Sequence, residues 1–310
     1  MSESASAYGF AEIRCHRYGA DPDGDDRDTV IIEEPLELRV DGAAVVTVMR
    51  TPGHDRDLAL GLLHGESWID SLRDIDAVVL CGRRARHALD ALDALDGKAP
   101  DATSRPGNVF ESGNVVDVRL ADHVPPPPSV RPRLAMSSCG VCGKRTIEEV
   151  LGLTRASLRS SPAPSPGGPL RSSDVIARLP AVLREHQTLF ERTGSVHAAA
   201  LFDHRGRPLV VREDVGRHNA VDKVIGWALL GGALPLSDVV LQVSGRVSFE
   251  IVQKAFRAGI PMVAAVSGVS TLASELAVRA GITLIGFLRG GSFNVYAHPE
   301  RLSRSGPAQE

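Results

Sequence analysis

The second half of the chain alternates strand and helix patterns three times, and this alternation limits the possible fold more than any other feature. Apolar runs at 239–243, 262–266 and 282–288 predict buried strands, and amphipathic stretches at 219–230, 249–257 and 271–279 predict helices beside them. Buried strands joined by helices favour a mainly parallel sheet with helices on both faces. We therefore expect a three-layer α/β domain from about residue 172 onward.

Helix and strand patterns also precede this alternation. Ser173 is predicted to cap a helix that Pro180 can divide and that Gly194 ends. A strand pair at 196–202 and 209–212 follows, joined by a glycine-containing turn. This strand pair leads directly into the first helix of the alternating region.

The first half of the chain predicts a smaller, mixed lobe that is rich in β-structure. Alternation over 30–50 around Asp41-Gly42 indicates a β-hairpin, and a leucine-rich helix follows and ends at Gly65 in a left-handed conformation. Further strands are expected at 77–81 and 114–120. The predicted parts are a loose, acidic segment over 1–29, the β-rich lobe over 30–123, proline-rich linkers that carry a cysteine pair over 124–171, and the α/β lobe over 172–310.

The cysteine pair, Cys139 and Cys142, has C-x-x-C spacing and lies between two proline-rich segments. Such a pair can form a disulfide, bind a metal, or carry sulfur on one thiolate. Zinc usually takes four ligands, and the other cysteines, Cys15 and Cys81, are isolated. The cysteines of a redox pair normally lie at the start of a helix that follows an early strand of a small α/β domain. A position between two proline-rich segments is therefore unusual for redox exchange. The tethered placement fits sulfur carriage best, and an inert surface loop is the remaining alternative.

The composition argues against several classes of protein. Four cysteines are too few for a disulfide scaffold, and no basic and then apolar start marks a signal peptide, so we expect the thiols to lie in a reducing cytoplasm. No apolar run approaches the roughly 18 residues of a membrane span. The net charge of −3 is too small to indicate nucleic-acid binding.

Polar loops follow the three predicted strands, and ligands in such sheets bind beyond the carboxyl ends of the strands. These loops are Ser244-Gly245-Arg246, Ser267-Gly268 and Arg289-Gly290-Gly291-Ser292. Glycines allow close backbone approach, and Arg246 and Arg289 can pair with phosphate oxygens. The loops therefore predict a phosphorylated or nucleotide-bearing ligand, although neither a Walker P-loop nor a G-x-G-x-x-G motif is present.

A second polar group, Asp214, Arg217 and His218, lies where a strand leads into a helix, with His197 on the preceding strand. Taken singly, Asp214 can cap the helix, His218 can be a solvated first-turn residue and His197 can be a core histidine. Their convergence with the three loops favours a binding site. In that site Asp214 would orient His218 or a ligand amine, and Arg217 would hold an anion.

Several of these motifs together resemble the formate dehydrogenase accessory sulfurtransferase family, FdhD/NarQ. The stretches that carry the resemblance are SCGVCG at 138–143, EDVGRHNAVDK at 213–223, SGR at 244–246 and VYAHPERL at 295–302. The likeness extends from EEPL at 33–36 and MRTPG at 49–53 to the C-terminal region, and therefore covers most of the chain after residue 30.

The resemblance implies a homodimeric, cytoplasmic sulfur carrier. It would accept sulfur from a cysteine desulfurase and pass it to the bis(molybdopterin guanine dinucleotide) molybdenum cofactor, a bound substrate, before that cofactor enters formate dehydrogenase. The family's persulfide cysteine falls on Cys139, and Cys142 has no assigned role. The family's cofactor-binding stretch falls on Phe287, Leu288, Arg289, Gly290, Gly291 and Ser292. Some members carry another glycine and a basic residue where this chain has Gly291 and Ser292.

The family also implies a sheet resembling the cytidine deaminase fold. A zinc deaminase needs H-x-E followed by P-C-x-x-C, whereas this chain has His197-Ala198-Ala199 and its C-x-x-C comes earlier. No metal site is therefore expected. Two alternatives to the sulfur carrier remain: a non-catalytic chaperone of the molybdenum cofactor and, with less motif support, a zinc-dependent hydrolase.

Overall fold

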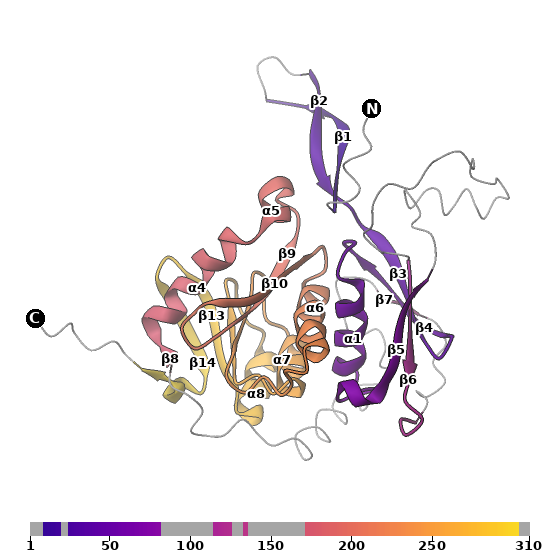
Figure 1. Cartoon of the computed structure of the whole chain (residues 1–310). Coiled ribbons are helices and arrows are strands. Elements are labelled where there is room, and N and C mark those ends of the chain that lie inside the picture. Colours follow the sequence, from indigo (N-terminus) through magenta and orange to yellow (C-terminus); the bar gives the residue numbers. More distant parts are fainter. Residues whose placement is uncertain (1–8, 20–23, 82–113, 126–132, 136–170, 304–310) are drawn as a thin grey trace, which may run out of the picture.

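A six-stranded sheet and a five-stranded sheet lie on either side of two packed helices, α1 (Asp55–Gly65) and α6 (Arg217–Leu230) (Figure 1). The computed structural model describes residues 9–19, 24–81, 114–125, 133–135 and 171–303. The two sheets correspond to the two lobes that the sequence predicts.

The larger sheet has the strand order β10-β9-β11-β12-β13-β14. Its strands are β9 (His197–Phe202), β10 (Pro208–Asp214), β11 (Val240–Val243), β12 (Met262–Ala265), β13 (Thr283–Arg289) and β14 (Ser292–Ala297). The pairs β11–β12 and β12–β13 are parallel because helices connect their strands, whereas short turns make β9–β10 and β13–β14 antiparallel, as is β9–β11. The sheet is therefore mixed, and the prediction of a mainly parallel sheet is wrong.

Helices cover both faces of this sheet. α6, α7 (Phe249–Arg257) and α8 (Thr271–Ala280) share one apolar core with Leu241 and Val263 on the first face. α4 (Ser173–Glu185) shares a second core with Phe202 and Met262 on the opposite face. The predicted three-layer α/β arrangement is confirmed, and its likeness to the cytidine deaminase fold stays a prediction.

The smaller sheet has the order β5-β6-β3-β4-β7, and α1 packs against it. Its strands are β3 (Glu34–Val40), β4 (Ala43–Arg50), β5 (Ile75–Cys81), β6 (Val115–Leu120) and β7 (Arg133–Ala135). The predicted hairpin, helix and two later strands of this lobe are confirmed. β7 lies within the predicted linkers over 124–171 and pairs with β4. The exact domain boundaries stay predictions.

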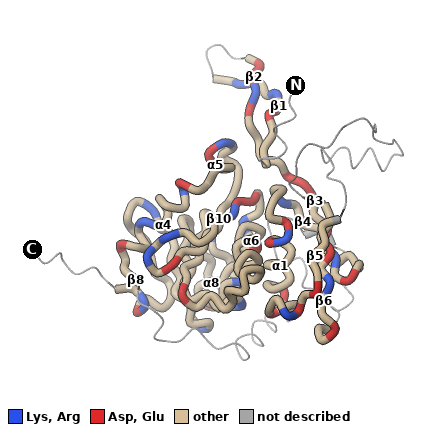
Figure 2. Tube along the Cα trace, viewed as in Figure 1, with Lys and Arg blue, Asp and Glu red and all other residues tan. Residues whose placement is uncertain are grey.

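An antiparallel ribbon of β1 (Phe10–Arg17) and β2 (Gly24–Ile31) projects from the body, as Figure 1 shows. The prediction of a loose segment over 1–29 is therefore wrong for these strands. Contacts between the strands offset the repulsion among acidic residues, since Arg17 Nε lies 2.9 Å from Asp26 Oδ2 and Arg27 Nη1 lies 3.3 Å from Glu12 Oε2. Figure 2 shows acidic and basic residues close together on this ribbon.

The helix at the start of the α/β lobe differs from the prediction at both ends. Ser172 caps α4 instead of Ser173, because the Ser172 side chain accepts a hydrogen bond from the backbone of the first turn. Pro180 lies inside α4 without dividing it. The chain instead leaves the helix before a separate one, α5 (Thr188–Thr193), which Gly194 ends with a φ of 64°.

Gly65 ends α1 but is not left-handed, so that part of the prediction is wrong. Glycine at this position leaves room for Lys254, because a Cβ would lie 3.0 Å from Lys254 Nζ. The remaining elements are short: η2 (Leu72–Asp74), β8 (Arg171–Ser172), η3 (Pro299–Arg301) and β15 (Leu302–Ser303), with β8 and β15 paired in parallel.

Helices α1 and α6 cross at two glycines that let their backbones touch. A Cβ on Gly61 would lie 1.9 Å from the carbonyl oxygen of Asp222, and a Cβ on Gly226 would lie 1.8 Å from that of Asp57. Both helices thus carry D-x-x-x-G, and the glycine of each meets the aspartate backbone of the other. This reciprocal contact holds the helix of the smaller lobe directly against the first helix of the larger one.

Replacing Gly61 with alanine is expected to lower the free energy of unfolding by about 3 kcal/mol, because the two helices would have to separate. Gly231→Ala, at the end of α6, is the matched control, since its Cβ would meet atoms only at 3.5 and 3.6 Å. Urea unfolding of both variants measures the difference. Equal stability of the two variants would contradict the close crossing.

Candidate functional site

The loops after β11, β12 and β13 lie together at the carboxyl ends of these strands, as the sequence predicts. We call this end of the larger sheet the sheet edge. β9 begins and β10 ends at the same edge, because His197 pairs with Asp214 and Ala199 pairs with Val243. The structure therefore brings the predicted residues to one edge: Asp214, Arg217, His218, Ser244, Gly245, Arg246, Phe287, Leu288, Arg289, Gly290, Gly291 and Ser292. The role of these residues in binding a cofactor stays a prediction, apart from that of Asp214.

Backbone hydrogen bonds join the three loops to one another. Val247 donates its N–H to the carbonyl of Gly268 at 3.1 Å and accepts from the N–H of Ser270 at 3.1 Å. Phe287 donates to the carbonyl of Ser267 at 2.9 Å. The edge from β11 to β13 is thus a continuous surface about 10 Å across, two strand spacings wide.

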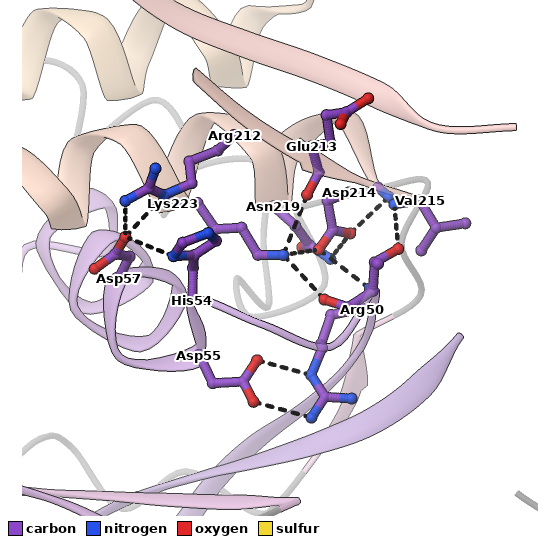
Figure 3. A network of polar contacts seen from close by, with 12 residues as sticks. Arg50, His54, Asp55, Asp57, Arg212, Glu213, Asp214, Val215, Asn219 and Lys223 are labelled. Atoms are coloured by element: carbon purple, nitrogen blue, oxygen red, sulfur yellow. Dashed lines mark hydrogen bonds and ion pairs between the residues drawn. The ribbon is translucent and has the colours of Figure 1, made fainter. Parts of the chain in front are cut away.

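Asp214 is a structural hub and has no free carboxylate oxygen for a ligand. It is fully buried, and its Oδ1 accepts hydrogen bonds from Gly216 N at 2.8 Å and Asn219 Nδ2 at 2.9 Å. Its Oδ2 accepts from Thr51 N at 3.2 Å and lies 2.7 Å from Lys223 Nζ (Figure 3). The prediction that Asp214 orients His218 or a ligand amine is therefore wrong, because protein groups occupy both oxygens.

The loop between β4 and α1 reaches this hub from the smaller lobe. Lys223 Nζ donates to the carbonyl of Thr51 at 2.9 Å, and Thr51 Oγ1 accepts from Val215 N at 3.1 Å. The preceding residue, Arg50, is fully buried and forms two hydrogen bonds to Asp55, at 2.9 and 3.0 Å (Figure 3). The two lobes therefore share one polar network next to the sheet edge.

His218 is a buried, neutral histidine at the start of α6. Its Nε2 lies 3.1 Å from Ser248 Oγ and 3.4 Å from Glu250 Oε2. Burial, followed by the positive charges of Lys254 and Arg217, lowers the pKa of His218 to about 3. Because a carboxylate only accepts, the contacts favour the tautomer with hydrogen on Nε2. Nδ1 then keeps a lone pair, and it has no hydrogen-bond partner within the described residues.

His197 is the second histidine of this edge, and it lies against the first predicted loop. A Cβ on Gly245 would lie 3.2 Å from His197 Nδ1, so the absence of a side chain at residue 245 favours this close approach. Burial and the charges of Arg217 and Arg246 lower the pKa of His197, and the charge of Asp214 opposes them. The edge therefore combines neutral imidazoles with guanidinium charges, an arrangement that favours an anionic ligand.

A buried ion pair lies behind His218. Lys254 Nζ is 2.7 Å from Asp222 Oδ1, and both side chains are almost fully buried. Burial opposes the charge of Lys254, but Asp222, Glu250 and Glu66 outweigh it and raise the pKa of that ammonium group. Lys254 therefore stays protonated, and Asp222 and Glu250 balance its charge behind the edge.

The predicted cofactor-binding stretch begins with a left-handed residue. Phe287 has a φ of 54°, and the register of β13 with β14 shifts between Gly286 and Arg289. The shift leaves Phe287 40% exposed while Leu288 joins the apolar core beneath α4. The Phe287 ring covers Gly268, and the Arg289 guanidinium lies 5.7 Å from the ring centroid. The stretch thus offers an aromatic face beside a cation, which suits a planar anionic ligand.

Cys139 and Cys142 lie outside the described residues, so their predicted role stays a prediction. Among the residues that the structure describes, no group of three His, Cys, Asp or Glu side chains is placed to hold a metal ion. In the same part of the chain, no helix has both the length and the apolar character needed to cross a membrane.

The residues that support the edge from behind were not predicted. The sequence does give one indication for Lys223, which lies next to Asp222 in an otherwise apolar helix pattern. A charged side chain at such a position is expected to be buried and therefore to need a partner. Arg50 and Thr51 carry no such indication beyond their place in MRTPG, because their partners lie far away in the sequence. Gln242, in β11, also carries no signal of its own, because it lies within an apolar run.

The fold and the residues at the sheet edge together define the class of protein. This chain is a two-lobed α/β protein with positively charged side chains at the sheet edge. The chain belongs to the FdhD/NarQ family, whose family model matches residues 31–303. The family resemblance predicted from the sequence is therefore confirmed.

Two relatives and one solved structure illustrate this membership. The chain is 46% identical over 278 residues to the sulfur carrier protein FdhD of Nocardia farcinica, covering 89% of this chain and 88% of the relative. It is 44% identical over 298 residues to the protein of that name from Mycobacterium tuberculosis, covering 96% and 99%. The crystal structure of a candidate formate dehydrogenase accessory protein from Desulfotalea psychrophila has the same fold, with a TM-score of 0.67, 22% identity, and coverage of 95% and 99%.

His218 makes stability depend on pH below neutrality. Its folded pKa of about 3 lies below the ordinary value of 6.5, so only the unfolded chain takes up a proton between these values. The free energy of unfolding is expected to fall with decreasing pH, by up to about 1.4 kcal/mol per pH unit from this group. In His218→Gln, urea unfolding at a series of pH values should show a shallower slope. His64 is buried with its pKa lowered to about 4, so part of the slope remains. An unchanged slope would show that His218 is not held neutral.

Proposed function

We propose that this chain is a cytoplasmic sulfur carrier that takes persulfide sulfur from a cysteine desulfurase and transfers it to the bis(molybdopterin guanine dinucleotide) molybdenum cofactor before insertion into formate dehydrogenase. Family membership and the relatives named sulfur carrier protein FdhD support this proposal. The main observation behind this proposal is that one chain combines two features. It has a C-x-x-C pair, and its α/β lobe has a positively charged sheet edge.

Acceptance of sulfur requires only a thiolate on this chain. The Cys139 thiolate attacks the terminal sulfur of the donor's persulfide, the sulfur–sulfur bond of the donor breaks, and the donor cysteine leaves as a thiolate. Cys139 then carries the persulfide. No outside oxidant or reductant is consumed, because one sulfur–sulfur bond replaces another.

Delivery of that sulfur as sulfide requires two electrons, and Cys142 is placed in the sequence to supply them. Attack of the Cys142 thiolate on the inner sulfur of the persulfide forms a Cys139–Cys142 disulfide and releases hydrosulfide to the metal centre of the cofactor. A cellular dithiol then reduces the disulfide. Hydrogen bonding from Cys142 to the persulfide, or exchange of sulfur between the two thiols, are alternative roles for the second cysteine.

The sheet edge is the proposed site for the guanine dinucleotide part of the cofactor. Arg246 and Arg289 are exposed there and can form charge-assisted hydrogen bonds with phosphate oxygens. Neutral His197 and His218 add no further charge, and Gly245 allows close approach beside His197. The Phe287 ring is available for stacking on a purine or pterin.

The alternatives differ from the carrier in what they require. A non-catalytic chaperone of the molybdenum cofactor would use the sheet edge alone and would tolerate loss of Cys139. A zinc-dependent hydrolase would hold stoichiometric metal, and it has the weakest support from motifs. A homodimer is proposed on the family likeness only, and a desulfurase and formate dehydrogenase are the proposed protein partners.

Incubation with a cysteine desulfurase and cysteine is expected to add about 32 Da to Cys139, the mass of one sulfur atom, as detected by mass spectrometry of intact protein and peptides. Cys139→Ala should carry no adduct and should fail to support formate dehydrogenase activity. Cys142→Ala is the matched control, which removes the neighbouring thiol and should still carry the adduct. Full dehydrogenase activity with Cys139→Ala would favour the chaperone instead.

Arg246→Ala and Arg289→Ala are each expected to weaken GDP binding about tenfold to a hundredfold, because each removes a charge-assisted contact with phosphate. Calorimetric titration at two salt concentrations should also show a smaller salt dependence for both variants. Arg205→Ala is the matched control, since it removes another exposed guanidinium, from the β9–β10 turn at the opposite end of the strands. Equal weakening in all three variants would place the nucleotide elsewhere.

A further inference from the structure

Of the two histidines at the sheet edge, His197 is the one that a ligand can reach. His197 is half-buried, whereas His218 is only 5% exposed and its unpaired Nδ1 is covered by protein. The imidazole of His197 makes no side-chain hydrogen bond within the part of the chain that the structure describes. A polar ring that solvent reaches and that the protein leaves unbound is available to a ligand.

His197 is the first residue of β9, and its side chain lies on the face of the sheet that α6 covers. Two residues later, Ala199 belongs to the apolar core beneath α6, so strand alternation places His197 on that same face. The ring lies against Gly245, where a Cβ would be 3.2 Å from His197 Nδ1 and 3.8 Å from Arg217 Cβ. The imidazole and Arg217 therefore meet at the first loop of the sheet edge, directly before Arg246 in the chain.

The ionisable groups that face His197 come from three elements: Asp214 of β10, Arg217 and His218 of α6, and Arg246 of the loop after β11. Burial lowers the pKa of His197, and the charges of Arg217 and Arg246 lower it further against the opposing charge of Asp214. Without a ligand the imidazole is therefore neutral near pH 7.

A phosphate group beside this ring would reverse the electrostatic balance. Its oxygens would pair with Arg217 and Arg246 and cancel the two positive charges that keep His197 neutral. The start of α6 also attracts an anion, since the N-cap residue Gly216 makes no side-chain cap hydrogen bond and the positive end of the helix dipole lies there. An imidazole next to a bound anion holds a proton more tightly, and the protonated ring can donate from both nitrogens.

We propose that His197 is a phosphate-binding residue that takes up one proton from the solvent when the diphosphate of the ligand binds at the sheet edge. This inference rests on the proposed function, which places a guanine dinucleotide there. Histidine suits this position better than a third arginine, because an arginine stays charged. Three cations would then repel one another whenever the ligand is absent.

Calorimetric titration with GDP-mannose measures the proton uptake. The diphosphate of GDP-mannose is esterified at both ends, like that of the proposed cofactor, and does not titrate near neutral pH. Titration at about pH 7 in Tris and in PIPES, two buffers that differ in ionisation enthalpy, gives the number of protons bound with the ligand. We expect about 0.5–1 proton for the wild-type chain and about none for His197→Gln.

The dependence of binding on pH separates a binding role of His197 from a merely structural one. Because a proton enters with the ligand, acid favours the complex, and the wild-type dissociation constant should rise by up to about tenfold per pH unit between about pH 6 and 8. His197→Gln should bind at least about tenfold more weakly than the wild type at about pH 6 and nearly equally at about pH 8. A structural role alone would weaken binding by the same factor at every pH.

His204→Gln is the matched control. His204 is an exposed histidine in the β9–β10 turn, at the opposite end of the strands from the sheet edge. This variant should take up as many protons as the wild type and show the same dependence of binding on pH.

The wild-type chain alone can refute the role of His197. Binding of GDP-mannose to the wild type without proton uptake would overturn that role and leave the proposed function intact. Proton uptake that His197→Gln retains in full would overturn it as well, because another group would then take the proton. Absence of wild-type binding to both GDP-mannose and GDP would overturn the nucleotide-binding half of the proposed function together with this inference.

Discussion

The contact between α1 and α6 is the constraint on which the arrangement of the two lobes depends. At Gly61 and Gly226 each helix has no side chain, and each accepts the aspartate backbone of the other at a distance that no Cβ allows. The side chains of the same two aspartates form ion pairs with neighbouring elements. Asp57 binds Arg212 of β10, and Asp222 binds Lys254 of α7. Backbone contact and ion pairs therefore fix α1 against both the sheet and the helices of the larger lobe.

This crossing brings buried charges together, and those charges are poor sources of stability by themselves. Removing Lys223 and Asp214 from water costs several kcal/mol per ion, which their 2.7 Å contact offsets only because backbone groups complete the network. The network instead determines geometry. It fixes the loop at Thr51 to the corner between β10 and α6, from which Arg217 and His218 extend. The smaller lobe thereby supports the residues of the sheet edge from behind.

The sequence predicted the elements of the larger lobe well because each depends on local periodicity. The helix at Phe249–Arg257 has the predicted bounds, and the carboxyl-end loops lie together because the order of strands and helices requires it. Strand direction was less predictable, since short turns and not helices join β9 to β10. The sequence pattern assigns Asp214 to a ligand, because nearby residues do not indicate its partners, Thr51 and Lys223. Long-range polar contacts have no periodicity, so the sequence alone does not disclose them.

The sheet edge contrasts with the interior that supports it. Asp214, Arg50 and Lys223 are buried and paired within the protein, whereas His218 Nδ1 and the Gln242 amide are buried and have no hydrogen-bond partner among the described residues. His218 Nδ1 lies at the sheet edge, where the proposed ligand would bind, whereas the Gln242 amide lies within the sheet on the face that α4 covers. In the proposed sulfur carrier, the Cys139 thiol would accept sulfur without any of these groups. Recognition of the acceptor would then depend on the sheet edge.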